Sequence, residues 1–275
     1  MKNTLKNTSE DRIYACILSF YETIAAWKKT YKRALTAVLP PPAIDADLAA
    51  IKLKSGFPLI DKERLALDEA MIKPHFLALL DIVGHKNPQE AHAIALQVAD
   101  LNVFKHLLTD TLRHGACADH SQLLRFLLQE TVHPLLEVHA DFLAGKIGVE
   151  DWHCGYCPMC GSNPMLGVLK GQEGKKYLIC EACLSEWLFS RSRCSRCGTA
   201  SSVKMAYFTV QDDERYRVET CDACKRYLKV IDQRGDHPEK SAMVANLTTL
   251  HLDIIAVKKG YTPVTSFFQE RHPPE

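Results

Sequence analysis

The sequence predicts an α+β protein, in which an all-helical N-terminal domain precedes two small four-cysteine metal modules of rubredoxin-like or zinc-ribbon type and a C-terminal helix. Apolar residues recur at helical spacing through the first half of the chain, whereas nine of the 11 cysteines lie between Cys154 and Cys224. Short stretches punctuated by Gly and Pro separate these cysteines. The expected units are residues 1–150, 151–190, 191–235 and 236–275.

Composition narrows the class of protein. With 275 residues, 47% of them hydrophobic and 24% charged, the chain is expected to be globular. The 34 Lys and Arg against 33 Asp and Glu give a formal charge of +1, so no overall field favours a polyanion or an anionic membrane surface. No apolar run is long enough for a membrane span or resembles a secretory signal. We therefore expect a cytoplasmic protein whose thiols stay reduced.

Helical periodicity defines the elements of the N-terminal half. Apolar spacing predicts a first helix to about residue 29, and a second short helix should end before the three prolines at 40–42. The Gly-Phe-Pro-Leu stretch at 56–59 is another break. Further helices are expected over residues 61–84, 88–102, 103–114 and 121–145, of which the middle two can also form one bent helix.

The pattern changes to short extended segments from Trp152 onward. Two hairpins are expected, with strands at residues 165–170 and 175–179 and at residues 203–210 and 216–219. A mostly helical pattern follows over about 240–259 and is closed by Gly260. We expect this last helix to pack back onto the modules or the helical half, and the tail beyond it to fray.

The clustered cysteines form four C-x-x-C pairs separated by 19, 10 and 23 residues. The pairs are Cys157 with Cys160, Cys180 with Cys183, Cys194 with Cys197, and Cys221 with Cys224. In a reducing compartment such pairs are typical of tetrahedral metal sites, because one turn presents two sulfurs to a point and a second turn completes the S4 set. Thiolate softness restricts the ion to zinc, or to iron in a rubredoxin-like or Fe-S environment. Cys154 is the odd cysteine.

Spacing alone leaves the grouping of the pairs open. Joining neighbours gives C-x2-C-x19-C-x2-C and C-x2-C-x23-C-x2-C, whereas an interleaved arrangement would join the first pair to the third and the second to the fourth. Gly161 and Gly198 each follow a pair, and a positive φ there would point backbone N–H groups at the thiolates. The basic residues beside the cysteines either offset the thiolate charge or form an ordinary solvated face.

Motifs for catalysis are missing from the sequence. It contains no G-x-x-x-x-G-K-[ST], G-x-G-x-x-G, H-E-x-x-H or G-x-S-x-G pattern. A site closed by four thiolates has no open position for a substrate, so the metals are expected to be structural or electron-carrying. We therefore predict that the chain is not an enzyme.

Two other classes of function compete with a metal-stabilised binding protein. A nucleic-acid binder is suggested by the basic run at 191–196 and by aromatic residues on the expected strands, although the near-zero net charge disfavours it. These aromatic residues are Tyr177, Trp187, Tyr207 and Phe208. An iron-thiolate redox carrier is the other alternative.

Several motifs together resemble the formate dehydrogenase accessory protein family of FdhE type. They are C-P-M-C-G-S-N-P at 157–164, the pair Cys180/Cys183 with Trp187, R-C-S-R-C-G at 193–198, E-T-C-D-A-C-K-R-Y-L-K at 219–229 and L-T-T-L-H-L-D-I-I-A-V-K-K-G-Y at 247–261. The helical half agrees in length and in the G-F-P-L element at 56–59. The specific motifs are confined to residues 154–261.

This resemblance implies a cytoplasmic helper needed for active respiratory formate dehydrogenase. It would act on the catalytic subunit before export or assembly, as a maturation factor and not as a dehydrogenase, with rubredoxin-like sites that hold two ions of iron or zinc. The sequence leaves the choice between monomer and homodimer open. The ligands carried over from the family are Cys157, Cys160, Cys180 and Cys183 for one site and Cys194, Cys197, Cys221 and Cys224 for the other.

Overall fold

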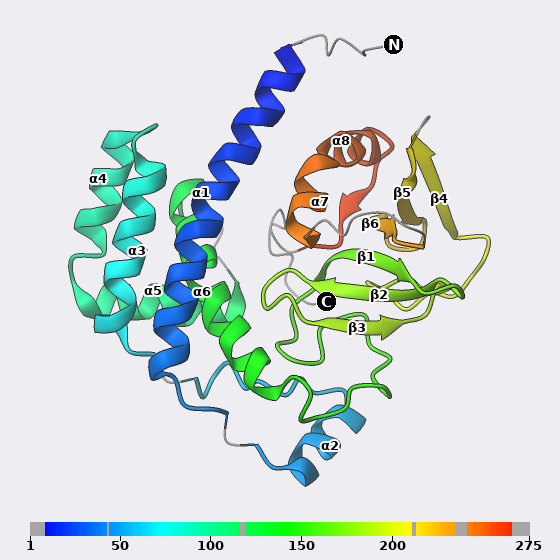
Figure 1. Ribbon diagram of the computed structural model, residues 1–275, viewed down its shortest axis with the longest axis horizontal. Helices are drawn as coiled ribbons and strands as arrows, with labels where there is room; N and C mark the ends of the chain where they lie inside the picture. Colours follow the sequence, from blue (N-terminus) through cyan, green and yellow to red (C-terminus); the bar gives the residue numbers. More distant parts are fainter. Residues whose placement is uncertain are drawn as a thin grey trace.

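The computed structural model describes residues 9–42, 44–65, 67–115, 119–210, 213–234 and 241–265. Helices fill the first half of the chain, and a seven-stranded sheet with two short helices follows (Figure 1). The predicted α+β class, with N-terminal helices and two four-cysteine clusters behind them, is confirmed. Within these ranges no helix combines the length and apolarity that a membrane crossing requires.

Six helices make up the described part of the N-terminal half. They are α1 Ser9–Val38, α2 Ala46–Lys54, α3 Glu69–Gly84, α4 Pro88–Gln97, α5 Leu101–His114 and α6 Gln122–Leu143. Trp27 and Tyr31 on α1 lie against each other, and Phe76 on α3 meets Phe104 on α5 edge to face. The core therefore forms where the apolar stripes of α1, α3, α5 and α6 meet.

The helix boundaries differ from the predicted ones in three places. Helix α1 runs unbroken to Val38, because Tyr31 and Leu35, both fully buried, continue its apolar stripe beyond residue 29. Helix α2 occupies a stretch for which we predicted no helix. Helix α3 begins only at Glu69, since the Asp68 side chain accepts a hydrogen bond from the Met71 N–H and caps it there.

Helices α4 and α5 are separate, as in the first of the two predicted arrangements. The Asp100 carboxylate accepts hydrogen bonds from the N–H groups of Asn102 and Val103, which starts a new helix. Pro134 lies inside α6, in line with the predicted single helix through this stretch. Cys117 lies outside the described residues.

The strands form one mixed sheet in the order β3-β2-β1-β6-β5-β4, with β7 beside β6. Their bounds are β1 Pro164–Lys170, β2 Lys175–Cys180, β3 Glu186–Phe189, β4 Met205–Val210, β5 Asp213–Cys221, β6 Arg226–Asp232 and β7 Thr262–Pro263. Both predicted hairpins are present, as β1–β2 and β4–β5, but β3 and β6 were not predicted. Each module is thus a three-stranded antiparallel unit, and parallel pairing of β1 with β6 joins the two units into one sheet.

The sheet is strongly curled. Lys176 on β2 and Glu219 on β5 form an ion pair of 2.9 Å, although β1 and β6 lie between these strands in the sheet. Figure 1 accordingly shows β1–β3 running across the direction of β4 and β5. The concave side therefore encloses charged side chains, and Lys176 is only 1% exposed.

The C-terminal segment forms two short helices instead of one, α7 Ala242–Thr248 and α8 Leu250–Lys258. The break lies at Thr249, whose hydroxyl donates to the carbonyl of Ala245 at 2.8 Å and ends α7. Leu252 and Ala256 of α8 share a buried cluster with Val218 and Tyr227 of the sheet. Helix α8 thus packs onto the second module, whereas α7 contacts β1 of the first module and α1, so the C-terminal segment packs back onto the modules and the helical half. Residues 266–275 of the expected frayed tail lie outside the described ranges.

Candidate metal centres

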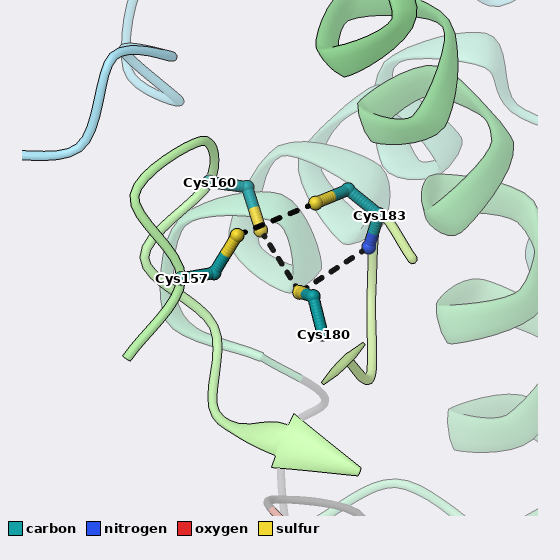
Figure 2. A group of neighbouring side chains, drawn as sticks. All are labelled: Cys157, Cys160, Cys180 and Cys183. Carbon is teal, nitrogen blue, oxygen red and sulfur yellow. Dashed lines mark hydrogen bonds between the residues drawn. The ribbon is translucent and has the colours of Figure 1, made fainter. Parts of the chain in front are cut away.

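The first candidate centre, centre one, consists of Cys157, Cys160, Cys180 and Cys183. Their sulfurs all lie within 4.8 Å of one another and point toward a common point (Figure 2). The Sγ atoms of Cys157 and Cys183 are 3.5 Å apart, and those of Cys160 and Cys180 are 3.4 Å apart. Zinc–sulfur bonds of about 2.3 Å give a tetrahedron with edges of about 3.8 Å, whereas a disulfide needs about 2.05 Å. These four sulfurs therefore fit an ion and not a crosslink.

Centre two consists of Cys194, Cys197, Cys221 and Cys224, whose sulfurs also lie within 4.8 Å of one another. The Sγ distances are 3.7 Å from Cys194 to Cys224 and 3.7 Å from Cys197 to Cys221. Both centres join neighbouring pairs along the chain, so the structure brings the sulfurs together in the sequential arrangement and not in the interleaved one. Each predicted ligand residue lies in the cluster expected for it.

All four cysteine turns share one backbone feature. The residue after the second cysteine has a positive φ in every case, at 76° for Gly161, 59° for Leu184, 72° for Gly198 and 54° for Lys225. Sequence reasoning identified the two glycines and missed the other two, because leucine and lysine carry no turn signal. A non-glycine residue in this conformation costs about 1 kcal/mol, and such strain persists only where the surroundings impose it.

The turns aim backbone N–H groups at the sulfurs. The N–H groups of Ala182 and Cys183 both donate to Cys180 Sγ at 3.4 Å, and the Arg196 N–H donates to Cys194 Sγ at 3.4 Å. Each such dipole stabilises negative charge on the sulfur. The donor set, its size and its N–H partners thus all fit a thiolate-bound divalent ion.

Electrostatics favour one thiolate in each cluster before any metal binds. Burial raises the pKa of Cys157 and Cys180, whereas in Cys160 hydrogen bonds from the other three thiols outweigh burial and hold the pKa well below its ordinary value. In centre two, burial is outweighed by hydrogen bonds from Thr199 and the neighbouring thiols, which lower the pKa of Cys197 to about 6. Metal binding then displaces the remaining thiol protons.

The two centres differ in exposure. All four cysteines of centre one are buried, whereas in centre two Cys197 is exposed and Cys224 is half-buried. Centre one lies where the sheet meets the helical half, and its cysteines belong to the same apolar core as Trp27 and Phe76. Centre two lies outside that core among described residues, so solvent reaches it more directly.

The G-F-P-L segment docks directly on the first cysteine turn. The N–H groups of Leu59 and Ile60 donate to the carbonyls of Pro158 and Met159 at 2.9 and 2.8 Å. A Cβ atom on Gly161 would lie 2.8 Å from the Pro58 ring, which is closer than real Cβ contacts. Gly161 therefore serves both the turn and this contact. The segment that the sequence marked as a break is the point where the two halves join.

Side chains beside the first turn strengthen the same junction. Tyr156 donates from its hydroxyl to the Gly56 carbonyl at 2.7 Å, and Lys62 Nζ donates to Ser162 Oγ at 3.1 Å. The Trp187 indole donates to the Cys154 carbonyl at 3.2 Å and is 1% exposed. Trp187 is thus a core residue and is not available to stack on a nucleobase, and Cys154 belongs to neither cluster.

Two closed four-sulfur sites on a curled sheet, joined to a helical half through one of them, define a metal-thiolate protein of mixed helix and sheet. Family models for the FdhE central domain and the FdhE C-terminal domain match residues 156–191 and 192–266. An FdhE homolog of Aquifex aeolicus is 31% identical over 215 residues, which cover 75% of this chain and 74% of the relative. The chain belongs to the FdhE family.

Other relatives extend the comparison. An FdhE homolog of Pectobacterium carotovorum is 28% identical over 82% of this chain and 74% of its own length. The FdhE protein of Escherichia coli K12 is 36% identical over 109 residues, which cover 38% of this chain and 34% of that protein. The crystal structure of the FdhE protein from Pseudomonas aeruginosa shares the fold, with a TM-score of 0.60 at 24% identity over 88% of this chain and 85% of that one.

Proposed function

We propose that this protein is a cytoplasmic accessory factor required for active respiratory formate dehydrogenase, and that its metal-stabilised region binds the catalytic subunit of that enzyme. Membership of the FdhE family supports this role. The observation that carries it is the closure of both centres by four cysteines. A site without an open coordination position shapes a surface and does not bind a substrate.

The eight cysteines would hold two ions of iron or zinc. A bound divalent ion would supply a crosslink between the two turns of each module, which have little apolar core of their own. Backbone hydrogen bonds from Leu59 and Ile60 hold the first turn against the helical half. Parallel pairing of β1 with β6 holds the two modules together. The product is a continuous surface that spans helices and sheet.

We infer a binding role and not catalysis. Within the described ranges, the groups with metal-ligand geometry are these two clusters, and both are complete with four sulfurs. A helper of this kind acts by contact with its client. Its activity should therefore fall in variants that alter the contact surface or unfold the protein.

Capture of the catalytic subunit by tagged protein tests the proposal. The wild type and Cys16→Ser, which removes an exposed cysteine outside both clusters, should retain the subunit. The Cys180→Ser variant lacks one sulfur of the buried centre one and should no longer retain the catalytic subunit. Normal formate oxidation in a strain that lacks this protein would count decisively against the proposed function.

An electron carrier is the second candidate, and the exposure of Cys197 favours it because a centre near the surface lies close to a docked electron donor or acceptor. This reading predicts iron in the native protein and a reversible change of visible absorption on reduction. A colourless, zinc-only protein purified from native cells without air would exclude it.

A further inference from the structure

A cavity of about 590 Å³ lies between the helical half and the sheet. Phe126 and Leu136 of α6 form one apolar wall, and Met243 and Leu247 of α7 form another. Residues of three of the four cysteine turns also line it. Its volume is in the range of ligand-binding cavities, and its lining combines these apolar walls with many polar and charged side chains.

Five cationic side chains line this cavity. Lys229 forms a salt bridge with Asp253, and the other four are Lys62, Arg113, Arg196 and Arg226. Among the salt bridges between described residues, none includes any of the four. Lys62 donates to Ser162 Oγ, Arg113 to the Glu63 carbonyl and Arg226 to the Pro263 carbonyl, each at 3.1 Å. The hydrogen-bond partners of these three side chains are neutral oxygens, so no carboxylate among the described salt bridges offsets their positive charges.

Two of the three carboxylates that line the cavity are held in salt bridges, one with Lys28 outside the lining and one with Lys229 inside it. Glu130 accepts from Lys28 at 2.8 Å and Asp253 accepts from Lys229 at 2.7 Å, and Glu181 is the third lining carboxylate. The cavity therefore carries an excess of positive charge.

The thiolates of centre one lie behind this surface. Cys160 is 2% exposed, and the positive charge of Lys62 stabilises its thiolate. Lys62 therefore offsets part of the negative charge of centre one. Arg113 and Arg196 are exposed, and Arg226 is half-buried. These three arginines are the groups free to meet an incoming anion.

We propose that this cavity binds an extended acidic segment of the client polypeptide, whose carboxylates meet Arg196 and Arg226 while an apolar side chain packs between α6 and α7. The proposal rests on the proposed function and names its binding surface. Guanidinium groups match carboxylates with two parallel hydrogen bonds, and a cationic lining rejects a basic segment. The apolar walls select a segment that carries both kinds of side chain.

Fluorescence anisotropy of a labelled short peptide of alternating glutamate and leucine tests this, with the metal-loaded full chain as the binder. Binding should be saturable and should weaken as salt rises. Arg196→Gln with Arg226→Gln should weaken it by about tenfold or more. Arg33→Gln, the control for Arg196→Gln alone, removes one positive charge from an exposed position on α1 outside the cavity and should leave the affinity unchanged. Arg196→Gln alone guards against misfolding, since no described side-chain hydrogen bond depends on it, and metal content and circular dichroism confirm the fold.

Several results would overturn the proposal. Equal binding of a peptide with lysine in place of glutamate would remove the charge argument. Tighter binding of single-stranded RNA or of pyrophosphate, with the same loss in the double variant, would assign the cavity to another anion. Peptide binding that appears only in a chain ending at Thr265 would make residues 266–275 the occupant.

Client capture separates this inference from the proposed function. If wild type and double variant retain the catalytic subunit equally well, the function stands and the cavity is not its surface. If neither retains it, the proposed function fails, while the peptide experiment still decides whether the cavity takes acidic segments.

Discussion

Glu219 forms a buried ion pair across the curled sheet. Its carboxylate accepts from Lys176 at 2.9 Å and from Arg217 at 2.6 Å, and the Lys176 side chain is 1% exposed. Because a buried cation without its partner is costly, Glu219→Gln should lower the free energy of unfolding by about 3 kcal/mol. Urea unfolding of the metal-loaded protein measures this.

The matched control is Glu186→Gln. This residue pairs with Lys170 at 2.8 Å, but both side chains are about one-third exposed. Such a pair contributes less than about 1 kcal/mol. Equal losses in the two variants would show that the curled sheet does not rest on Glu219.

His133 gives the fold a defined pH dependence. Burial lowers its pKa to about 4, although Glu130 opposes the shift. In the unfolded chain, the pKa of a histidine is near 6.5. Between pH 6.5 and pH 4, His133 is therefore protonated in the unfolded chain but neutral in the folded chain. The contribution of neutral His133 to the free energy of unfolding is therefore fully present above pH 6.5. It decreases as the pH falls, by about 2 kcal/mol between pH 7 and pH 5.

His133→Gln removes this contribution. Urea unfolding at pH 7 and pH 5 should show a smaller acid loss in the variant than in the wild type. Both proteins carry the same eight thiols, so the acid release of metal cancels in the difference. An identical loss in both would contradict the assignment to His133.

The repeated element of this protein is a cysteine turn, a hairpin, a second turn and a strand. It occurs once as Cys157 to Phe189 and again as Cys194 to Asp232. The sequence predicts the turns and hairpins because glycine, cysteine spacing and short alternating strands are local signals. It does not predict β3 and β6, since β6 gains its stability partly from parallel pairing with the distant β1.

The exposure of the two centres predicts unequal metal loss at this level. A coloured chelator should remove one ion quickly and the other slowly, because Cys197 is exposed and all four sulfurs of centre one are buried. Cys197→Ser should abolish the fast phase and Cys157→Ser the slow one. A single phase in the wild-type protein, followed by absorbance, would contradict the difference between the centres.

For the candidate site, too, the sequence predicts the features that depend on neighbouring residues and misses those that depend on contacts between distant residues. C-x-x-C spacing identifies all eight ligand sulfurs, because each turn is set by a few neighbouring residues, but it leaves their grouping into two centres open. The exposure difference, the junction at Leu59 and Ile60, and the cavity between α6 and α7 depend on contacts far apart in the chain, for which one sequence holds no pattern.

At the scale of the molecule, centre one holds the halves together. The apolar core runs without interruption from α1 through Cys157 and Trp187, so the expected boundary near residue 150 crosses a packed interface. Cys180→Ala should leave the metal module loose and expose residues after about 150 to protease, while the helices, which have their own aromatic contacts, are cut more slowly. Timed proteolysis with mass spectrometry measures this, and a variant with full metal content and full resistance would refute it.

The hydrogen bonds from Leu59 and Ile60 to the first cysteine turn also bear on how the protein is made. During translation, residues 56–60 are synthesised well before Cys157, and N-terminal regions tend to fold first. The nascent chain therefore presents a prepared template on which the first pair of thiols can be arranged as it emerges. We expect the first ion to be acquired by a chain that is already half folded, so that metal shortage would stall a helical intermediate instead of producing a wholly unfolded one.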